Sequence, residues 1–97
     1  MAKVYWISVY RSITDPDRLA AYAKVSGQAL TAAGGKILAR GEPAVTKEAG
    51  QPLRTVILEF ESVEAARAAY DSPGYQEALR ILGPGSAERD IRIIEAI

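Results

Sequence analysis

Residues 53–60, with the sequence LRTVILEF, decide the class of fold, because they form the clearest strand pattern in the chain. β-branched and aromatic side chains of this kind favour an extended, pleated backbone. The preceding residues 47–52, KEAGQP, have turn chemistry and separate this strand from an earlier one at residues 36–45. Two strands joined by a short polar loop are expected to form an antiparallel hairpin.

Helices are predicted on both sides of this hairpin. After it, Ser62 can cap an alanine-rich helix, and Pro73 interrupts that helix and starts a further helical segment. Before it, residues 14–17 (TDPD) form a helix start and residues 34–35 (GG) a helix end, with an apolar stripe at helical spacing between them. The remaining strand patterns lie at residues 3–10 and 89–97.

The order β, α, β, β, α, β predicts one ferredoxin-like domain of the α+β class over residues 1–97, with a four-stranded antiparallel sheet and its helices on one face. The opposite face would stay open, yet the strands carry apolar side chains on both sides. Leu58 and Phe60 lie on one side of their strand, for example, and Ile57 on the other. Because so large an apolar patch is unusual on a monomer, we expect the chain to form a homodimer through this face.

The composition excludes several classes of function. Twelve basic and twelve acidic residues cancel, so neither nucleic acid nor a membrane surface is an expected partner. Histidine and cysteine are absent, which removes the commonest metal ligands and the usual axial ligand of haem, so no metal and no cofactor is expected. No segment approaches the ~20 apolar residues of a membrane span, and the start has no signal-peptide layout. A cytoplasmic location is expected.

Motifs along the whole chain resemble a known family. They are Tyr5-Trp6, Thr14-Asp15-Pro16 with Tyr22, Gly34-Gly35, Arg40-Gly41, the segment from Val56 to Phe60, Ser62-Val63-Glu64-Ala65-Ala66, Tyr70-Asp71-Ser72-Pro73 and Tyr75-Gln76. In order and spacing they resemble a small, largely bacterial family called domain of unknown function thirteen-thirty, within the dimeric α+β-barrel superfamily. The resemblance implies two sheets packed face to face in a two-fold dimer. It implies no mechanism, because the family is named for lacking an assigned function.

Arg40 and Glu59 are the first candidates for chemistry. With the hairpin turn near residues 49–50, Arg40 is expected to lie opposite Glu59 on the same face of the sheet. Arg40 would then fix an anionic or carbonyl substrate, and Glu59 would act as the base. The alternative is a structural ion pair, because a nearby arginine lowers the pKa of a carboxyl group and makes it a poorer base near neutral pH.

Four tyrosines complete the set of candidates. Tyr5 and Tyr10 on the first strand and Tyr22 on the first helix are candidate ligand-binding residues, because an aromatic ring with a polar handle suits a pocket for a flat ligand. Tyr70, on the second helix, joins the catalytic candidates, since its hydroxyl could donate to a ligand oxygen. For each tyrosine the alternative is packing.

Two functions remain open at this point. The first is a cofactor-independent enzyme acting on a small apolar or aromatic metabolite, as monooxygenases and lactone isomerases with barrels of this kind do, which is an analogy of fold alone. The second is a non-catalytic homodimer that binds a small ligand or has a structural role. An apolar cavity on which two or more candidate polar groups converge would favour the enzyme. A filled core in which those groups pair with one another would oppose it.

Overall fold

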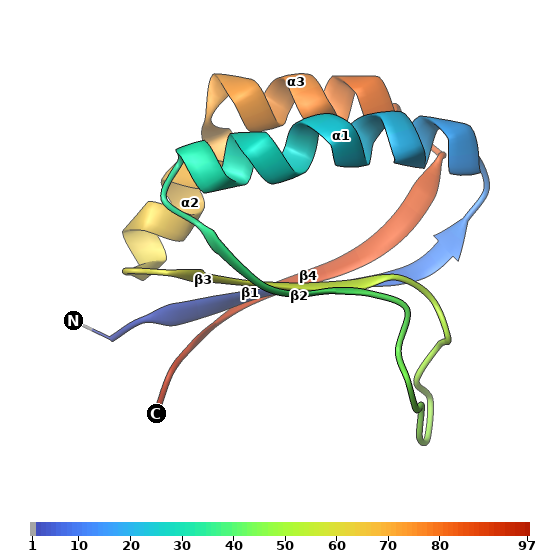
Figure 1. Cartoon of the computed structure of the whole chain (residues 1–97), viewed down its shortest axis with the longest axis horizontal. Helices are drawn as coiled ribbons and strands as arrows, with labels where there is room; N and C mark the ends of the chain where they lie inside the picture. The colour runs from blue at the N-terminus through green and yellow to red at the C-terminus, as the bar shows by residue number, and fades with distance from the viewer. Residues whose placement is uncertain (1) are drawn as a thin grey trace.

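The computed structural model describes residues 2–97, which form a four-stranded antiparallel sheet with three helices on one face (Figure 1). The elements are β1 (Val4–Ile13), α1 (Pro16–Ala32), β2 (Lys36–Gly41), β3 (Thr55–Phe60), α2 (Val63–Asp71), α3 (Pro73–Leu82) and β4 (Ala87–Glu95). The strand order across the sheet is β2-β3-β1-β4. This arrangement confirms the predicted ferredoxin-like α+β fold. Within residues 2–97, no helix is long and apolar enough to cross a membrane.

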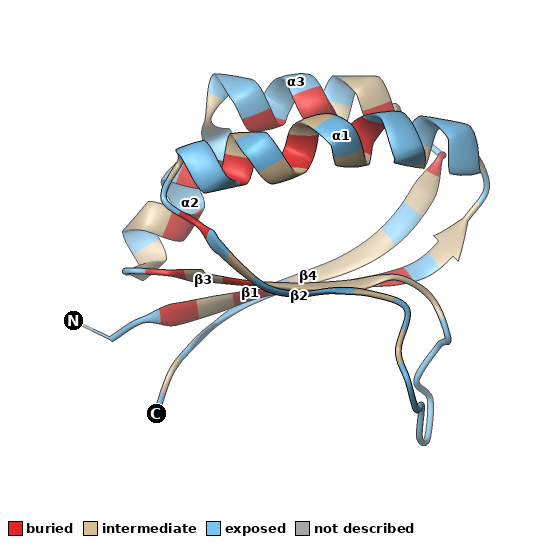
Figure 2. Cartoon of the chain, in the orientation of Figure 1, coloured by how far each residue is buried: buried red, intermediate tan, exposed pale blue. Residues whose placement is uncertain are grey.

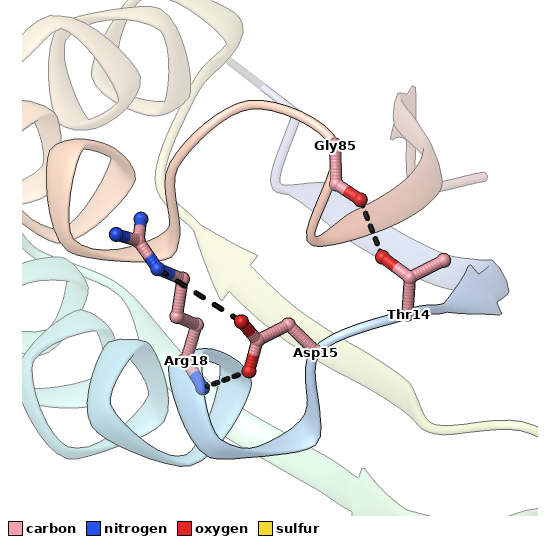
Figure 3. Close-up of polar contacts among 4 residues, drawn as sticks. All are labelled: Thr14, Asp15, Arg18 and Gly85. Atoms are coloured by element: carbon pink, nitrogen blue, oxygen red, sulfur yellow. Dashed lines mark hydrogen bonds and ion pairs between the residues drawn. The ribbon is translucent and has the colours of Figure 1, made fainter.

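Two side chains hold the start of α1 (Figure 3). The carboxylate of Asp15 accepts a hydrogen bond from the backbone N–H of Arg18 at 3.1 Å, as expected of an N-cap residue. The hydroxyl of Thr14 donates to the carbonyl oxygen of Gly85, in the loop before β4. The first contact is local and follows from the sequence motif. The second ties the first helix to the last loop of the fold.

A serine begins each of the two shorter helices. The hydroxyl oxygen of Ser62 accepts from the N–H of Ala65 at 3.1 Å, and that of Ser72 accepts from the N–H of Tyr75 at 3.3 Å. Ser72 lies between α2 and α3 and is both the C-cap of α2 and the N-cap of α3. The break that Pro73 predicts is therefore a capped boundary between two helices.

The core lies between the helices and the sheet (Figure 2). Its largest fully buried side chains are Trp6, Tyr10, Tyr75, Phe60, Leu58 and Val4. The Trp6 ring packs against Phe60, Tyr70 and Tyr75, with ring centroids 5.5 to 5.9 Å apart. Packing is so close at the end of α1 that a Cβ on Gly35 would lie 2.7 Å from the Phe60 ring, so the chain can turn there only with glycine.

The two faces of the sheet follow the predicted alternation. Trp6 of β1 lies beside Leu58 of β3 on the helix face, and Ile7 lies beside Ile57 on the open face. Other apolar residues of the open face include Tyr5, Val9, Ala39 and Ile94. The same face carries one feature that the pattern did not predict, a two-pronged ion pair in which Arg92 donates to both carboxylate oxygens of Asp90 at 3.1 and 3.0 Å.

The connection between β2 and β3 is longer than predicted. β2 ends at Gly41 and β3 begins at Thr55, so residues 42–54 form a long loop where the sequence suggests strand ends and a short turn. Figure 1 shows this loop extending away from the helices, on the side of the open sheet face. Loops of this length are uncommon in small domains.

The register of this strand pair corrects one prediction. A bulge after Ile37 shifts the pairing, so Arg40 lies opposite Val56, and Glu59 lies opposite Lys36. The predicted cross-strand pair of Arg40 with Glu59 is therefore wrong. Arg40 lies on the helix face with Val56, whereas Glu59 lies on the open face.

Candidate functional site

A small cavity lies between α1 and the helix face of the sheet. Its volume is about 30 Å³, which is room for a water molecule. Apolar side chains form much of its wall, among them Trp6, Leu30, Ile37, Val56 and Leu58. The polar side chains that line it are Ser8, Tyr10, Tyr22, Ser26, Arg40 and Arg54. Apolar walls with a few polar groups are typical of ligand sites.

A wider groove adjoins the cavity along α1 and β2. Its volume is about 510 Å³, and it shares Ala23, Gly27, Ile37 and Arg40 with the cavity wall. The side chain of Arg40 stands at this border, because its Nη1 would lie 3.5 Å from a Cβ placed on Gly27. Sites for small molecules commonly enclose about 300–1,000 Å³. The groove has a volume in this range, but it is more open to solvent than the cavity.

Two residues that line the cavity each carry a buried polar atom that lacks a partner. These atoms are the hydroxyl oxygen of Ser8 and the Nε of Arg54, neither of which has a hydrogen-bond partner among residues 2–97. Ser8 is only 5% exposed. Buried polar groups are nearly always paired in native proteins, and leaving one unpaired costs about 1–3 kcal/mol. A water molecule or a ligand atom in the cavity can supply such a partner.

Arg89 of β4 organises the tyrosines beside the cavity. Its Nη1 donates to the hydroxyl of Tyr22 at 2.7 Å and to that of Tyr75 at 3.2 Å, and the two hydroxyl oxygens lie 2.7 Å apart. The guanidinium carbon also lies 5.0 Å from the centre of the Tyr22 ring and 5.8 Å from that of Tyr10. Burial raises the pKa of Tyr22 and that of Tyr10, so both phenols stay protonated at neutral pH.

The arrangement can stabilise negative charge but offers no base. Arg40 and Arg54 bring positive charge, while Ser8 and Tyr22 carry hydroxyl donors. No aspartate or glutamate lines the cavity, and the lining tyrosines hold their protons. Within the described part of the chain, no cluster of side chains could hold a metal ion. The site therefore suits a molecule that brings its own negative charge or its own acidic proton.

Three of the six predicted candidates meet at this cavity, namely Tyr10, Tyr22 and Arg40. They come from β1, α1 and β2, which the sequence alone does not bring together. Tyr10 is 1% exposed and Tyr22 is 5% exposed, so both are also core residues. These two side chains therefore pack in the core and also line the cavity.

The other three candidates lie elsewhere. Tyr5 and Glu59 are opposite each other on the open face, where Glu59 accepts a hydrogen bond from the Lys3 ammonium at 3.3 Å. Tyr70 packs its ring against that of Trp6. Tyr5, Glu59 and Tyr70 do not line the cavity or the groove.

Sequence reasoning missed several residues of the site, namely Ser8, Ser26, Arg54, Tyr75 and Arg89. Ser8 could have been found from the sequence, because it interrupts the apolar side of β1 between Trp6 and Tyr10. Arg89 could have been found in the same way, since it shares the inner side of β4 with Ile91. A buried polar residue on a strand face that is otherwise apolar is an informative exception to the usual pattern.

Fold and cavity place the molecule among small ferredoxin-like proteins with a pocket between helix and sheet. The chain belongs to the family described as Domain of unknown function (DUF1330), whose model matches residues 3–97. This membership confirms the resemblance found in the sequence motifs. A search of curated proteins found none that matches the chain.

Solved structures share the fold. A protein of unknown function from Rhodopseudomonas palustris has a TM-score of 0.75 at 18% identity, with 99% of this chain and 83% of that chain covered. A dimeric ferredoxin-like protein of unknown function from Thermobifida fusca has a TM-score of 0.67 at 22% identity, covering 98% and 92%. SnoaB, a cofactor-independent oxygenase from Streptomyces nogalater, has a TM-score of 0.64 at 12% identity, covering 100% and 95%. At these identities the likeness shows the fold alone.

Proposed function

We propose that the protein is a cofactor-independent enzyme that takes a small apolar or aromatic metabolite into the cavity and groove beside α1. The observation that carries the proposal is the pair of unpartnered polar atoms, on Ser8 and Arg54, in a pocket with aromatic and aliphatic walls. Three predicted candidates converge on the same pocket. The fold of SnoaB, which is a cofactor-independent oxygenase, is compatible with such a role.

A second function is supported by a specific feature of the same pocket. The lining has no carboxylate, and its tyrosines stay protonated, so a reaction that needs a protein base has none there. This feature favours a non-catalytic protein that binds a small ligand. The two functions share the binding site and differ only in whether the ligand is converted.

Ligand binding is tested by a thermal-shift screen of a metabolite library. A ligand present at 100 times its dissociation constant is expected to add about 2.7 kcal/mol of stability, a rise in melting temperature of roughly 10–20 °C for a domain of this size. Ser26→Leu, which fills the cavity, is expected to abolish the rise, whereas Thr46→Leu in the exposed loop is expected to retain it. A rise that survives in Ser26→Leu, or a library with no effect, would contradict the proposed site.

Turnover then separates the enzyme from the binding protein. Each compound that raises the melting temperature is incubated with the protein, in air and without added cofactor, and the mixture is examined by mass spectrometry. A product formed by the parent chain but not by Ser26→Leu supports the enzyme. A ligand recovered unchanged supports the non-catalytic function.

We also propose that the protein is a homodimer through the open face of the sheet. Ile7, Ile57 and Ile94 lie on this face, and Ile94 is 56% exposed. Among residues 2–97 no helix covers this face (Figure 1). The Thermobifida fusca protein of the same fold is described as dimeric. Pairing with a second copy would remove the exposed apolar side chains from water.

Ile7→Asp is expected to convert the dimer to a monomer. Ile7 lies on the central strand β1, between Ile57 of β3 and Arg92 of β4, so a carboxylate there would be buried between the two sheets. Sedimentation velocity at micromolar concentration should give twice the mass of one chain for the parent protein and the mass of one chain for the variant. Ala68→Asp, on an exposed position of α2, is the control and should stay dimeric. A monomeric parent protein would refute the proposed assembly.

A further inference from the structure

We infer that the cavity selects a small organic anion, a carboxylate or an enolate, over a neutral molecule of the same shape. The inference rests on the proposed function and adds the charge of the ligand to it. Three observations support it. Arginines surround the cavity, Ser8 and Arg54 each have a polar atom without a partner, and one hydroxyl proton of the Tyr22–Tyr75 pair is not used in their hydrogen bond.

Positive charge around the cavity has no compensation from the protein. Arg40 and Arg54 line the cavity, and Arg89 reaches it through the Tyr22 hydroxyl. Among residues 2–97, the ion pairs of arginine involve Arg18, Arg80 and Arg92, and not these three. No aspartate or glutamate lines the cavity, so the charges of Arg40 and Arg54 are not balanced within its wall. Arg40 is exposed, whereas Arg54 and Arg89 are half-buried, and a half-buried guanidinium that lacks a carboxylate favours an anion from solution.

The unpartnered atoms are donors that match an anion. The Nε–H of Arg54 can only donate, and the Ser8 hydroxyl can donate its proton. A carboxylate or enolate oxygen can only accept, and it can take hydrogen bonds from both. A neutral amide of the same shape also presents N–H donors, which would oppose the arginines. The chemistry of the donors therefore discriminates by charge.

The tyrosine cluster leaves one more donor. Arg89 donates to the hydroxyls of Tyr22 and Tyr75, and one of these two hydroxyls donates to the other. The two tyrosines have two hydroxyl protons, but only one of these protons is used in the hydrogen bond between them. The other proton has no acceptor among residues 2–97. Tyr75 is 0% exposed, whereas Tyr22 lines the cavity. When Tyr75 donates to Tyr22, the Tyr22 proton is free to reach an acceptor in the cavity, and an anionic ligand supplies that acceptor.

The groove favours an organic anion over an inorganic one. Ala23, Ala32 and Ile37 line it, and covering them with a hydrated phosphate would gain nothing from the hydrophobic effect. An anion with an apolar or aromatic body satisfies both the donors and the walls. Its acidic oxygen would lie near Arg54 and Ser8, and its body would extend toward the groove bounded by Gly27 and Arg40.

The test uses matched probes in the full-length protein. Binding of benzoate, benzamide, acetylacetone and inorganic phosphate is measured by amide chemical shifts of the cavity residues. Benzoate is expected to bind at least roughly tenfold more tightly than benzamide, because a charged hydrogen bond is worth about 1.5–3 kcal/mol. Acetylacetone, whose enolate has its own ultraviolet absorption band, is expected to ionise at lower pH in the presence of protein if the site stabilises enolates.

Variants test which residues cause the preference for an anion. Arg54→Gln is expected to weaken benzoate binding by roughly tenfold or more and to leave benzamide binding unchanged, while Arg54→Lys recovers part of the loss. Arg67→Gln, an exposed arginine on α2, is the control and should change neither. Ser8→Ala is expected to weaken benzoate binding without lowering the melting temperature of the ligand-free protein, because the hydroxyl that it removes has no partner among residues 2–97. A purely structural serine would not give this combination.

The outcomes separate the two proposals. If benzamide and benzoate bind the cavity equally, the preference for an anion is overturned and the proposed function stands. If only phosphate binds, the organic character of the ligand is overturned. If none of the four probes shifts a cavity residue and the metabolite screen also finds no ligand, both proposals fail. If benzoate binds but Arg54→Gln and Arg67→Gln behave alike, the assignment of the anion to Arg54 is overturned.

Discussion

Replacement of Trp6 by alanine is expected to lower the free energy of unfolding by about 3–5 kcal/mol. The Trp6 side chain is 1% exposed and packs against three aromatic rings, those of Phe60, Tyr70 and Tyr75. The small domain cannot close over a void of this size, because its neighbours belong to β3, α2 and α3 and are each fixed by their own element. Domains commonly have about 5–15 kcal/mol of stability in total, so this single change would remove a large part of it.

Urea unfolding followed by circular dichroism measures this loss. Tryptophan fluorescence cannot be used, since Trp6 is the single tryptophan of the chain. Val45→Ala, at a side chain that is 71% exposed, is the control and should change the stability by no more than about 0.5 kcal/mol. All variants are compared at one protein concentration, because a dimer gains stability with concentration. A loss below about 1 kcal/mol in Trp6→Ala would show that the core does not depend on this ring.

Stability is expected to fall steeply at alkaline pH. Burial raises the pKa of Tyr22 well above its ordinary value of 10.0, and it raises the pKa of Tyr10 in the same direction. Below about pH 10 these phenols are protonated in both the folded and the unfolded chain, and the stability is fully present. Above that pH the unfolded chain loses protons that the folded chain retains. Unfolding then becomes more favourable by about 1.4 kcal/mol per pH unit for Tyr22, and Tyr10 acts in the same direction.

Tyr22→Phe isolates the contribution of one phenol. Urea unfolding is measured between about pH 8 and about pH 11 in the parent chain and in the variant. The variant is expected to start from a lower stability at about pH 8, because Arg89 and Tyr75 lose a hydrogen-bond partner. Above about pH 10 its stability should then fall less steeply, by about 1.4 kcal/mol per pH unit. Identical slopes in the two proteins would contradict the role given to Tyr22.

The elements of the fold could be predicted because their signals are local. Asp15 and Ser62 mark helix starts through bonds that span three residues, and the apolar alternation of residues 53–60 fixes which side faces the core. The faces of β1 and β3 follow from the same alternation. These features depend on the backbone geometry of one segment at a time, which the sequence of that segment records.

The register of β2 could not be predicted in the same way. It depends on the loop at residues 42–54 and on the bulge after Ile37, neither of which has a distinct sequence signal. A shift of one or a few residues moves a side chain to another partner or to the other face of the sheet. Because of this shift, Arg40 lies opposite Val56 on the helix face, and Glu59 lies opposite Lys36 on the open face.

The site was predictable only in part, because it is assembled from distant segments. Arg89 and Tyr22 are separated by 67 residues in the sequence, and their hydrogen bond depends on how β4 and α1 pack. Tyr22 could be proposed because a tyrosine on an apolar helix face stands out. Arg54 could not, since it precedes β3 in a loop where a charged residue is ordinary.

The position of β1 beside β4 has a consequence for how the protein is made. Val4 pairs with Glu95, so the two ends of this fold must meet before the sheet is complete. Contacts this far apart in the sequence close large loops and slow the folding reaction. During synthesis on the ribosome, one edge of β1 stays without its partner until nearly the whole domain has emerged, and an unpaired edge invites pairing with other chains. We therefore expect the nascent chain to remain prone to such pairing until β4 has been translated.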